Sequence, residues 1–471
     1  MKNRFNRLTS KEWLPFQKSW FKYRDDFQLY REHVRFFCKA EFNGAGIYFS
    51  GTETALLQEI ANDEGLQISS TIGENDTYEY ILIDLRKTIA NLDQSSNCLA
   101  HISDVVSLVS DLLEKLEDRR FVTVFVPQFI TSDQTFVPMA WMLAYSLSKI
   151  IHLKDEKIAC LDGDYDLNDT KSTKDVFYCL NFRKDAKTDI RKSNTDIDVF
   201  LKNGYYHNRM MENVELEKWF ILKPTPRKKN EILHPAKYPE DLVDMYVNAF
   251  TAPNANVFDP MSGTGSTQVA SLKNGRNAYG TELSPYFHNI AVERCLSLKS
   301  PSQMMLFNDG GHIGDFDIKN LDARHINPND FPPIHYIITS PPYWDMLNMK
   351  GAENQAKRVE KGLQTNYSDD DSDLGNIADY QTFIDDLAAI YIHLKHILVD
   401  KGLMTIVVKN IKKKGMNYPF AWDLTHALMD DFSLIDETFW CQDDINLAPY
   451  GYGNTFVSNT FHQYCLHFQK R

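Results

Sequence analysis

The pattern of apolar and polar positions predicts a strand, a loop and a helix over residues 256–271. An apolar run ends at Phe258, glycines follow at Gly263 and Gly265, and a helical pattern begins directly afterwards. Glycines at the end of a strand let the backbone approach a ligand closely. Because Gln268 stands where a third glycine is expected, the spacing departs from the GxGxxG pattern of dinucleotide-binding loops.

Each of the next two predicted strands is followed by a carboxylate. Residues 276–283 carry Glu282 near their end, and residues 318–326 place Asp322 in a turn. A carboxylate at the tip of the second strand can accept hydrogen bonds from the ribose hydroxyls of a nucleoside, and one in the later turn can accept from an adenine amino group. The alternative interpretations are a surface glutamate and a solvated turn aspartate.

A fourth predicted strand, within residues 334–344, ends in two consecutive prolines, Pro341 and Pro342. Prolines fix the backbone, here at the carboxyl end of a sheet, which is where open α/β sheets bind their ligands. Tyr343 follows with an aromatic face.

These segments together resemble the DNA amino-methyltransferases. Residues 340–343 resemble the family's (Asp/Asn/Ser)-Pro-Pro-(Tyr/Phe) catalytic motif, and residues 259–267 resemble its cofactor motif, with Met261 where phenylalanine is usual. Residues 234–239 resemble the His-Pro-x-x-x-Pro segment that precedes that motif. The resemblance covers residues 217–471, and it implies an α/β, Rossmann-like fold that uses S-adenosylmethionine.

The resemblance also implies the residues of the site. The catalytic motif would consist of Ser340, Pro341, Pro342 and Tyr343. The cofactor-binding residues would be His234, Lys237, Asp259, Pro260, Ser262, Gly263, Thr264, Gly265, Glu282, Leu283, Asp322 and Ala323.

The chemistry of methyl transfer explains these residue types. An exocyclic amine is a poor nucleophile because its lone pair is conjugated into the ring. The Ser340 hydroxyl and the Pro341 carbonyl can accept its hydrogens, and Tyr343 can stack on a base that has left the duplex. No metal and no covalent intermediate are required, and the absence of a Pro-Cys pair excludes cytosine-C5 enzymes. Serine in the first position resembles the N4-cytosine enzymes more than the N6-adenine enzymes.

The N-terminal half contains a repeat of the C-terminal half. Residues 138–143 parallel 419–424, and residues 156–162 parallel 437–443. In the segment that corresponds to 334–343, Asp84-Leu85-Arg86 replaces the proline motif, and the loop at 48–57 keeps one glycine. We therefore expect a duplicated fold, with a degenerate domain over 1–210 that neither binds cofactor nor catalyses, and a catalytic domain over 211–471. The alternative is chance similarity between two α/β regions.

Charge and cysteine content complete the expectations. The net charge of −13 is unusual for a protein that binds DNA, but basic residues cluster at 223–229 and 409–414. We expect one DNA groove between the halves, lined by Lys223, Arg227, Lys228, Lys229, Lys412, Lys413 and Lys414. The alternative is that these side chains lie on a solvated surface. The seven cysteines include no CxxC pair, which argues against a zinc site, and four of them fall at equivalent strand positions as small buried residues. The chain contains no run of eighteen apolar residues, so we expect no membrane span and a cytoplasmic location.

The sequence thus predicts methyl transfer from S-adenosylmethionine to an exocyclic amine of double-stranded DNA, cytosine N4, with the base flipped. Adenine N6, an RNA base amine, and a non-catalytic nucleic-acid-binding subunit are the alternatives. A restriction nuclease or defence complex is a further candidate partner.

Overall fold

A computed structural model describes residues 6–9, 12–13, 16–39, 45–90, 92, 95–130, 135–162, 176–185, 216–222, 238–300, 313–344, 373–413, 416–443, 458 and 460–471. The elements of the N-terminal half are β1 Trp20–Tyr23, α2 Asp26–Phe37, β2 Gly46–Ser50, α3 Thr54–Asp63, β3 Ile68–Ser69, β4 Tyr78–Asp84, α4 Arg86–Ala90, α5 Ser95–Leu113, β5 Leu116–Val126, β6 Phe129–Ile130, β7 Phe136–Val137, α6 Met139–Ser148, β8 His152–Leu161 and β9 Val176–Arg183.

The elements of the C-terminal half are β10 Trp219–Ile221, α8 Glu240–Phe250, β11 Asn256–Asp259, α9 Ser266–Lys273, β12 Asn277–Glu282, α10 Pro285–Leu298, β13 Phe316–Asn320, η2 Ala323–His325, η3 Pro328–Asp330, β14 Ile334–Thr339, η4 Leu374–Asn376, α13 Tyr380–Leu394, β15 Leu398–Val408, β16 Ile411–Lys413, β17 Met416–Tyr418, α14 Phe420–Leu428, β18 Phe432–Cys441 and β19 His462–Lys470.

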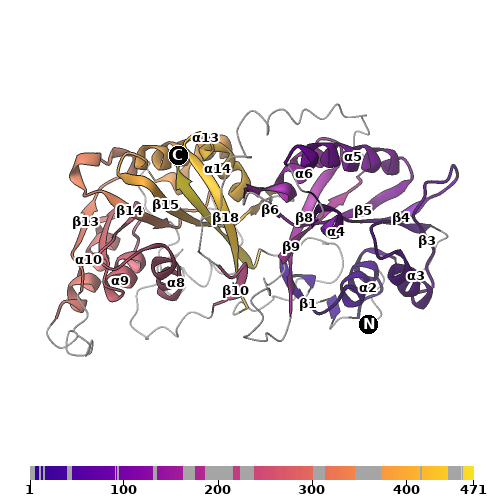
Figure 1. The fold of residues 1–471 in the computed structure, drawn as a ribbon, viewed down its shortest axis with the longest axis horizontal. Coiled ribbons are helices and arrows are strands. Elements are labelled where there is room, and N and C mark those ends of the chain that lie inside the picture. Colours follow the sequence, from indigo (N-terminus) through magenta and orange to yellow (C-terminus); the bar gives the residue numbers. More distant parts are fainter. Residues whose placement is uncertain are drawn as a thin grey trace.

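Each half is built around one large mixed sheet with helices on both faces (Figure 1). The N-terminal sheet has the strand order β1-β8-β9-β5-β4-β2-β3, and the C-terminal sheet has the order β10-β18-β19-β15-β14-β11-β12-β13. In both sheets the penultimate and last strands of the half run antiparallel to each other, while the strands that carry the predicted site are parallel. The expected α/β, Rossmann-like fold class is confirmed.

Local sequence explains the central elements. Every residue of β4 is buried, as expected for a strand covered on both faces. Helix α10 begins at Pro285 after the Ser284 side chain caps its first turn, and Asp25 caps α2 in the same way. Helices α5 and α6 lie on one face of the N-terminal sheet and α2 and α3 on the other (Figure 1).

The strand registers give a residue-by-residue correspondence between the halves. Val126 pairs with Tyr178 in the N-terminal sheet, and Val408 pairs with Tyr464 in the C-terminal sheet. Two residues earlier on these strands, Val124 of β5 pairs with Ile83 of β4, and Ile406 of β15 pairs with Thr339 of β14. Ile83 and Thr339 are therefore equivalent. Asp84 therefore occupies the position of Ser340. The same pairing makes Cys160 equivalent to Cys441 and Cys179 equivalent to Cys465, and all four are buried.

The two halves share a hydrophobic core. One cluster of buried side chains contains α5 and α6 residues from the N-terminal half together with α13 and α14 residues from the C-terminal half. The two sheets lie next to each other with this core at their junction (Figure 1). In the part of the chain that the structure describes, no helix combines the length and the apolar character that a bilayer crossing requires.

Candidate functional site

The predicted cofactor loop connects β11 to α9 at the carboxyl edge of the C-terminal sheet. Gly263 and Gly265 have positive φ angles of 53° and 78°, in the region that favours glycine. A Cβ atom on Gly265 would lie 2.9 Å from the Cβ of Ala291 on α10. The loop therefore needs glycine at this position both for its backbone angle and for its close contact with α10.

The loop is held from below by Asp259, the last residue of β11. Its carboxylate accepts hydrogen bonds from the Tyr238 hydroxyl at 2.9 Å, the Thr267 hydroxyl at 2.6 Å and the Met261 N–H at 3.0 Å. Complete burial raises the pKa of Asp259, against these hydrogen bonds, which lower it. In this structure Asp259 organises the loop, and its contact with the cofactor stays a prediction.

Glu282, at the end of β12, faces the same loop. Its Oε2 accepts from the Gly263 N–H at 2.7 Å and its Oε1 accepts from the Ser284 N–H at 2.9 Å. The side chain is buried, and burial raises the pKa of Glu282 to about 7 despite the two backbone hydrogen bonds. A carboxylate oxygen has two acceptor sites, so both oxygens keep capacity for hydroxyl donors such as those of a ribose.

The remaining predicted cofactor residues lie around this pair. Ser262, Thr264 and Pro260 are buried in the loop, and Ser262 donates its N–H to Thr281 at 2.9 Å. Leu283 is half-buried, and its carbonyl accepts from Asn320 at 2.9 Å. His234 and Lys237 lie outside the described residues.

Asp322 follows β13 and caps the short helix η2. It accepts the Arg324 N–H at 2.9 Å and forms an ion pair with the Arg324 guanidinium at 2.6 Å. Burial raises the pKa of Asp322, but the hydrogen bonds and charge of Arg324 outweigh it, so the pKa is lowered overall. Asp322 is thus an ionised acceptor beside the buried Ala323.

The predicted catalytic motif 340–343 leaves β14, which is the direct neighbour of β11. Phe258 pairs with Ile337, so the ends of these strands place the cofactor loop and residues 340–343 side by side on one edge of the sheet. Ser340 and Pro342 are half-buried, while Pro341 and Tyr343 are buried.

The Tyr343 side chain is held by two residues that the sequence did not single out. Its hydroxyl donates to Gln463 Oε1 at 3.0 Å, and the Lys409 ammonium lies 5.0 Å from the centre of its ring. Burial lowers the pKa of Lys409. Lys409 directly follows β15, the strand next to β14, and a search of all residues that follow parallel strands would have found it. Only 8% of Tyr343 is exposed. A base would therefore stack on Tyr343 either at the exposed part of its ring or after the contacts with Gln463 and Lys409 open.

The expectation that Lys412 lines a DNA groove is wrong. Its ammonium forms an ion pair with the fully buried Asp155 of the N-terminal half and donates to the Ser458 carbonyl at 2.8 Å. Lys413 lies 3.9 Å from the centre of the Trp344 ring, and Lys414 and residues 223–229 lie outside the described residues. A lysine bound to a buried carboxylate holds the halves together, because releasing it would leave that charge without its counterion.

The equivalent positions in the N-terminal half carry different residues. Phe49 pairs with Leu82, and this register makes Phe49 the counterpart of Asp259. Ser69 is the counterpart of Tyr279. Ile72 and Glu282 each lie three residues further on, so Ile72 is the counterpart of Glu282. Neither the buried acid that organises the loop nor the acid that faces it is present at these positions. Within the described residues, no cluster of side chains in either half could hold a metal ion.

Comparison with known proteins gives a match to one protein family. Residues 67–293 match the model of a family described as DNA methylase. The matched range begins just before β3 and ends inside α10. It therefore includes Asp84 and the loop of residues 259–267, and it ends before the motif at 340–343.

Two relatives and one solved structure show partial similarity. The chain is 37% identical over 76 residues to "Putative methylase YubD" of Escherichia coli (strain K12). This aligned segment covers 16% of this chain and 34% of that protein. The chain is also 31% identical over 75 residues to the type II methyltransferase M.BglII of Bacillus subtilis. That aligned segment covers 16% of this chain and 21% of the relative. The matches thus span well under half the length of either relative. The magnesium protoporphyrin IX methyltransferase of Synechocystis PCC 6803 with bound SAM aligns over 49% of this chain and 79% of its own, at 14% identity and a TM-score of 0.28.

Proposed function

The chain belongs to the DNA amino-methyltransferase family, and we propose that it transfers a methyl group from S-adenosylmethionine to the exocyclic amino group of a base in DNA, cytosine N4. The observation that supports this most strongly is the position of two loops. The loop of residues 259–267 and the motif at 340–343 leave neighbouring parallel strands at the same edge of one sheet. A methyl donor and an acceptor base held by these loops would meet there.

The residues present fit this cofactor. Gly263 and Gly265 give the loop its positive φ angles, and Glu282 offers a carboxylate with free acceptor capacity for the ribose hydroxyls. Asp322, after the next strand, can accept from the adenine amino group. When bound, the sulfonium of the cofactor supplies an electrophilic methyl group.

The chain's own residues would prepare the base amine. The Ser340 hydroxyl and the Pro341 carbonyl would accept its two hydrogens, so that the nitrogen can pyramidalise and free its lone pair. Pro342 limits the backbone that carries this carbonyl. The amine nitrogen would then be placed to displace the thioether of the cofactor from its methyl group, so that the sulfur–methyl bond breaks as the nitrogen–methyl bond forms, S-adenosylhomocysteine leaves and the proton of the amine passes to solvent. Catalysis on this proposal consists of positioning.

The division of labour between the halves is also a proposal. We assign methyl transfer to residues 211–471 and a non-catalytic, DNA-holding role to residues 1–210. Phe49 and Ile72 at the positions of Asp259 and Glu282 support a half without cofactor. A common origin by duplication would account for the shared strand order.

One experiment separates this function from its alternatives. The protein is incubated with methyl-labelled S-adenosylmethionine and either duplex DNA or tRNA, and the digested nucleosides are identified by mass spectrometry. N4-methyl-deoxycytidine would support the proposal, and N6-methyl-deoxyadenosine would correct the base. Label in tRNA alone would replace DNA by RNA. Binding of the cofactor without transfer to either substrate would favour a non-catalytic subunit.

A further inference from the structure

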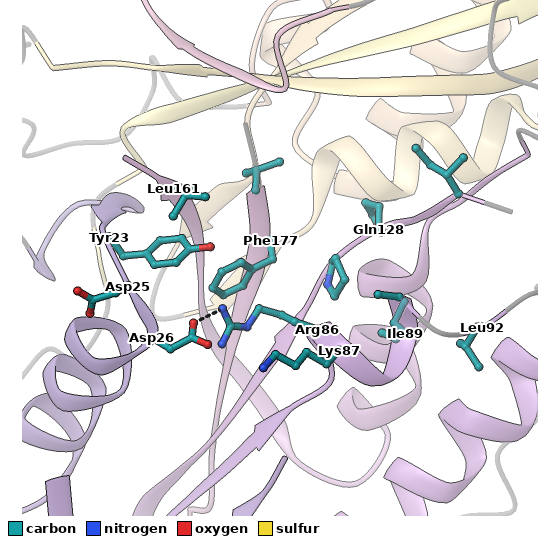
Figure 2. A pocket seen from close by; sticks show the side chains of 14 residues that line it. Tyr23, Asp25, Asp26, Arg86, Lys87, Ile89, Leu92, Gln128, Leu161 and Phe177 are labelled. Carbon is teal, nitrogen blue, oxygen red and sulfur yellow. Dashed lines mark hydrogen bonds and ion pairs between the residues drawn. The ribbon is translucent and has the colours of Figure 1, made fainter. Parts of the chain in front are cut away.

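The N-terminal half contains a cavity of about 840 Å³ that the proposed chemistry does not use. We call it the N-terminal pocket, and it lies at the edge of the sheet beside the ends of β1, β8, β9, β5 and β4, with residues of α2 and α4 in its lining (Figure 2). The residues that matter here are Tyr23, Asp26, Arg86, Lys87, Ala90 and Phe177. Its volume lies in the range of about 300–1,000 Å³ that is common for small-ligand sites.

The strand registers place this pocket at the counterpart of the proposed catalytic site. Since Asp84 is equivalent to Ser340, Lys87 three residues later is equivalent to Tyr343. Val176 pairs with Cys160 as His462 pairs with Cys441, so Phe177 is equivalent to Gln463. In its own half, the N-terminal pocket therefore lies beside the segment that corresponds to the base-binding motif.

One wall of the pocket is aromatic and is formed by the edge-to-face pair Phe177 and Tyr23. The Phe177 and Tyr23 rings lie 5.4 Å apart, and the Arg86 guanidinium lies 4.8 Å from the centre of the Phe177 ring. Figure 2 shows Phe177 at the centre of the pocket, between Tyr23 and Arg86. The apolar side chains of Ile89 and Leu92 line another part of it. Only 3% of Phe177 and 4% of Tyr23 are exposed, so a planar ring would contact the narrow part of each ring that borders the pocket.

Carboxylates outnumber cations around the pocket, since Asp25, Asp26, Asp84 and Glu53 lie beside Arg86 and Lys87. Arg86 forms ion pairs with Asp26 at 2.8 Å and with Asp84 at 2.6 Å, and Lys87 forms an ion pair with Glu53. Because each cation already has a carboxylate partner, the pocket has little excess positive charge to attract a phosphate. The same groups bring hydrogen-bond donors and acceptors to its polar end.

We propose that the N-terminal pocket binds a nucleobase, and that the base comes from a DNA strand held by the protein. An aromatic wall, an apolar wall and polar groups without excess positive charge match a base better than its phosphate. The source of the base rests on the proposed function, because a protein that acts on DNA bases holds unpaired ones. A free nucleoside has the same chemistry and is the other source.

The test fills the pocket without disturbing the core. Ala90 lines the pocket and is exposed, so Ala90→Trp places an indole in the cavity; Thr88→Trp, on the same helix but outside the lining, is the matched control. Duplex and single-stranded DNA of random sequence, with 5-iodouracil in place of thymine, is bound to each variant and irradiated. Cross-linked peptides are identified by mass spectrometry. In parallel, the four deoxynucleosides and S-adenosylmethionine are titrated by calorimetry.

We expect cross-links at Tyr23 or Phe177 in the wild type and in Thr88→Trp, reduced at least about fivefold in Ala90→Trp. Nucleoside binding that Ala90→Trp removes, without such cross-links, would support the base pocket with free nucleosides as its source. Bound DNA that cross-links only elsewhere, together with no nucleoside binding that Ala90→Trp removes, would overturn the proposal. Failure of the proposed function appears separately, as a lack of S-adenosylmethionine binding or methyl transfer, because neither assay of the pocket requires the cofactor.

Discussion

Trp141 and Trp422 stack on each other across the junction of the two halves, with ring centroids 5.9 Å apart and an angle of 28° between the rings. Each is almost completely buried, and each comes from the equivalent helix of its half, α6 or α14. Tyr178 and Tyr464 stack in the same way, with centroids 6.5 Å apart. The halves are therefore related by an approximate two-fold arrangement whose centre is a shared aromatic core.

Lys412 is expected to stabilise this junction. Its partner Asp155 is fully buried, so Lys412→Met would leave a buried charge with only Ser458 and the more distant Lys157 nearby. We expect a loss of about 3–5 kcal/mol in the free energy of unfolding, measured by urea denaturation.

Lys299→Met is the matched control for that variant. Lys299 pairs with Asp315 at 3.0 Å, but the pair is on the surface, with 84% of the Asp315 side chain exposed. Its removal should change the free energy of unfolding by less than about 1 kcal/mol. Equal small effects of both substitutions would show that the Lys412 pair does not hold the halves together.

Two buried carboxyls at the junction predict a pH dependence of stability. Burial raises the pKa of Glu156 to about 7 and that of Glu437 to about 8, although Tyr464 donates to Glu156 at 2.7 Å and Tyr178 to Glu437 at 2.9 Å. Both pKa values exceed the ordinary 4.5, so the folded protein binds more protons than the unfolded chain between these limits. The stability from these groups is complete below pH 4.5 and is lost as the pH rises through 7 to 8.

Thermal unfolding from pH 5 to pH 8.5 measures this effect. Glu156→Gln and Glu437→Gln keep the shape of the side chain and remove its charge, so the double variant should lose much less stability over this range than the wild type. A double variant that follows the wild-type curve would assign the pH dependence to other groups.

The sequence predicted the arrangement of strands and loops in the C-terminal half well because strand ends and special residues coincide there. Gly263, Gly265 and the proline pair mark loops at the ends of strands, and the structure places those loops on adjacent strands. The repeat also anticipated the equivalence of Cys160 with Cys441. Both kinds of information are local or periodic, which is what a single sequence carries.

Contacts between distant segments were not predictable in the same way. Lys412 appeared to be a free cation because its partner, Asp155, is 257 positions away in the chain. Tyr343 appeared to be open to a base because Gln463 and Lys409 become its neighbours only through the pairing of β14 with β15 and β15 with β19. The N-terminal pocket carries no sequence motif, because its lining residues come from strand ends and helices that are far apart in the chain.

Pro341→Ala and Tyr343→Ala should abolish methyl transfer without weakening the binding of the cofactor. Pro341 would hold a hydrogen-bond acceptor for the base amine, and misplacing that acceptor should reduce the rate by about 100-fold or more. Both residues leave β14, and Glu282 and the cofactor loop keep their hydrogen bonds in either variant. Rates of label transfer to DNA and cofactor dissociation constants by calorimetry are the two measurements.

Tyr343→Phe is the control for the second substitution. It keeps the ring and removes the hydroxyl that donates to Gln463 at 3.0 Å. If stacking is the role of Tyr343, this variant retains most of the activity. A variant as inactive as Tyr343→Ala would instead assign the role to the hydroxyl, and a loss of cofactor binding in proportion to activity would contradict the assignment of residues 340–343 to the base.

The elevated pKa of Glu282 predicts how cofactor affinity depends on pH. In the free protein burial raises this pKa to about 7, so the carboxyl is partly protonated at neutral pH. Ribose hydroxyls that donate to the carboxylate favour its ionised form, so the pKa must fall in the complex and binding must release a proton. The cofactor dissociation constant should therefore decrease as the pH rises from 6 to 8, and then level off. Calorimetry in buffers of different ionisation enthalpy would count the released proton directly.

Glu282→Gln keeps an acceptor oxygen but no titrating charge, so it should bind the cofactor with little dependence on pH. Glu282→Ala should lose about 1.5–3 kcal/mol of binding free energy. A wild-type dissociation constant that is flat from pH 6 to 8, or unchanged in Glu282→Ala, would remove Glu282 from the cofactor site.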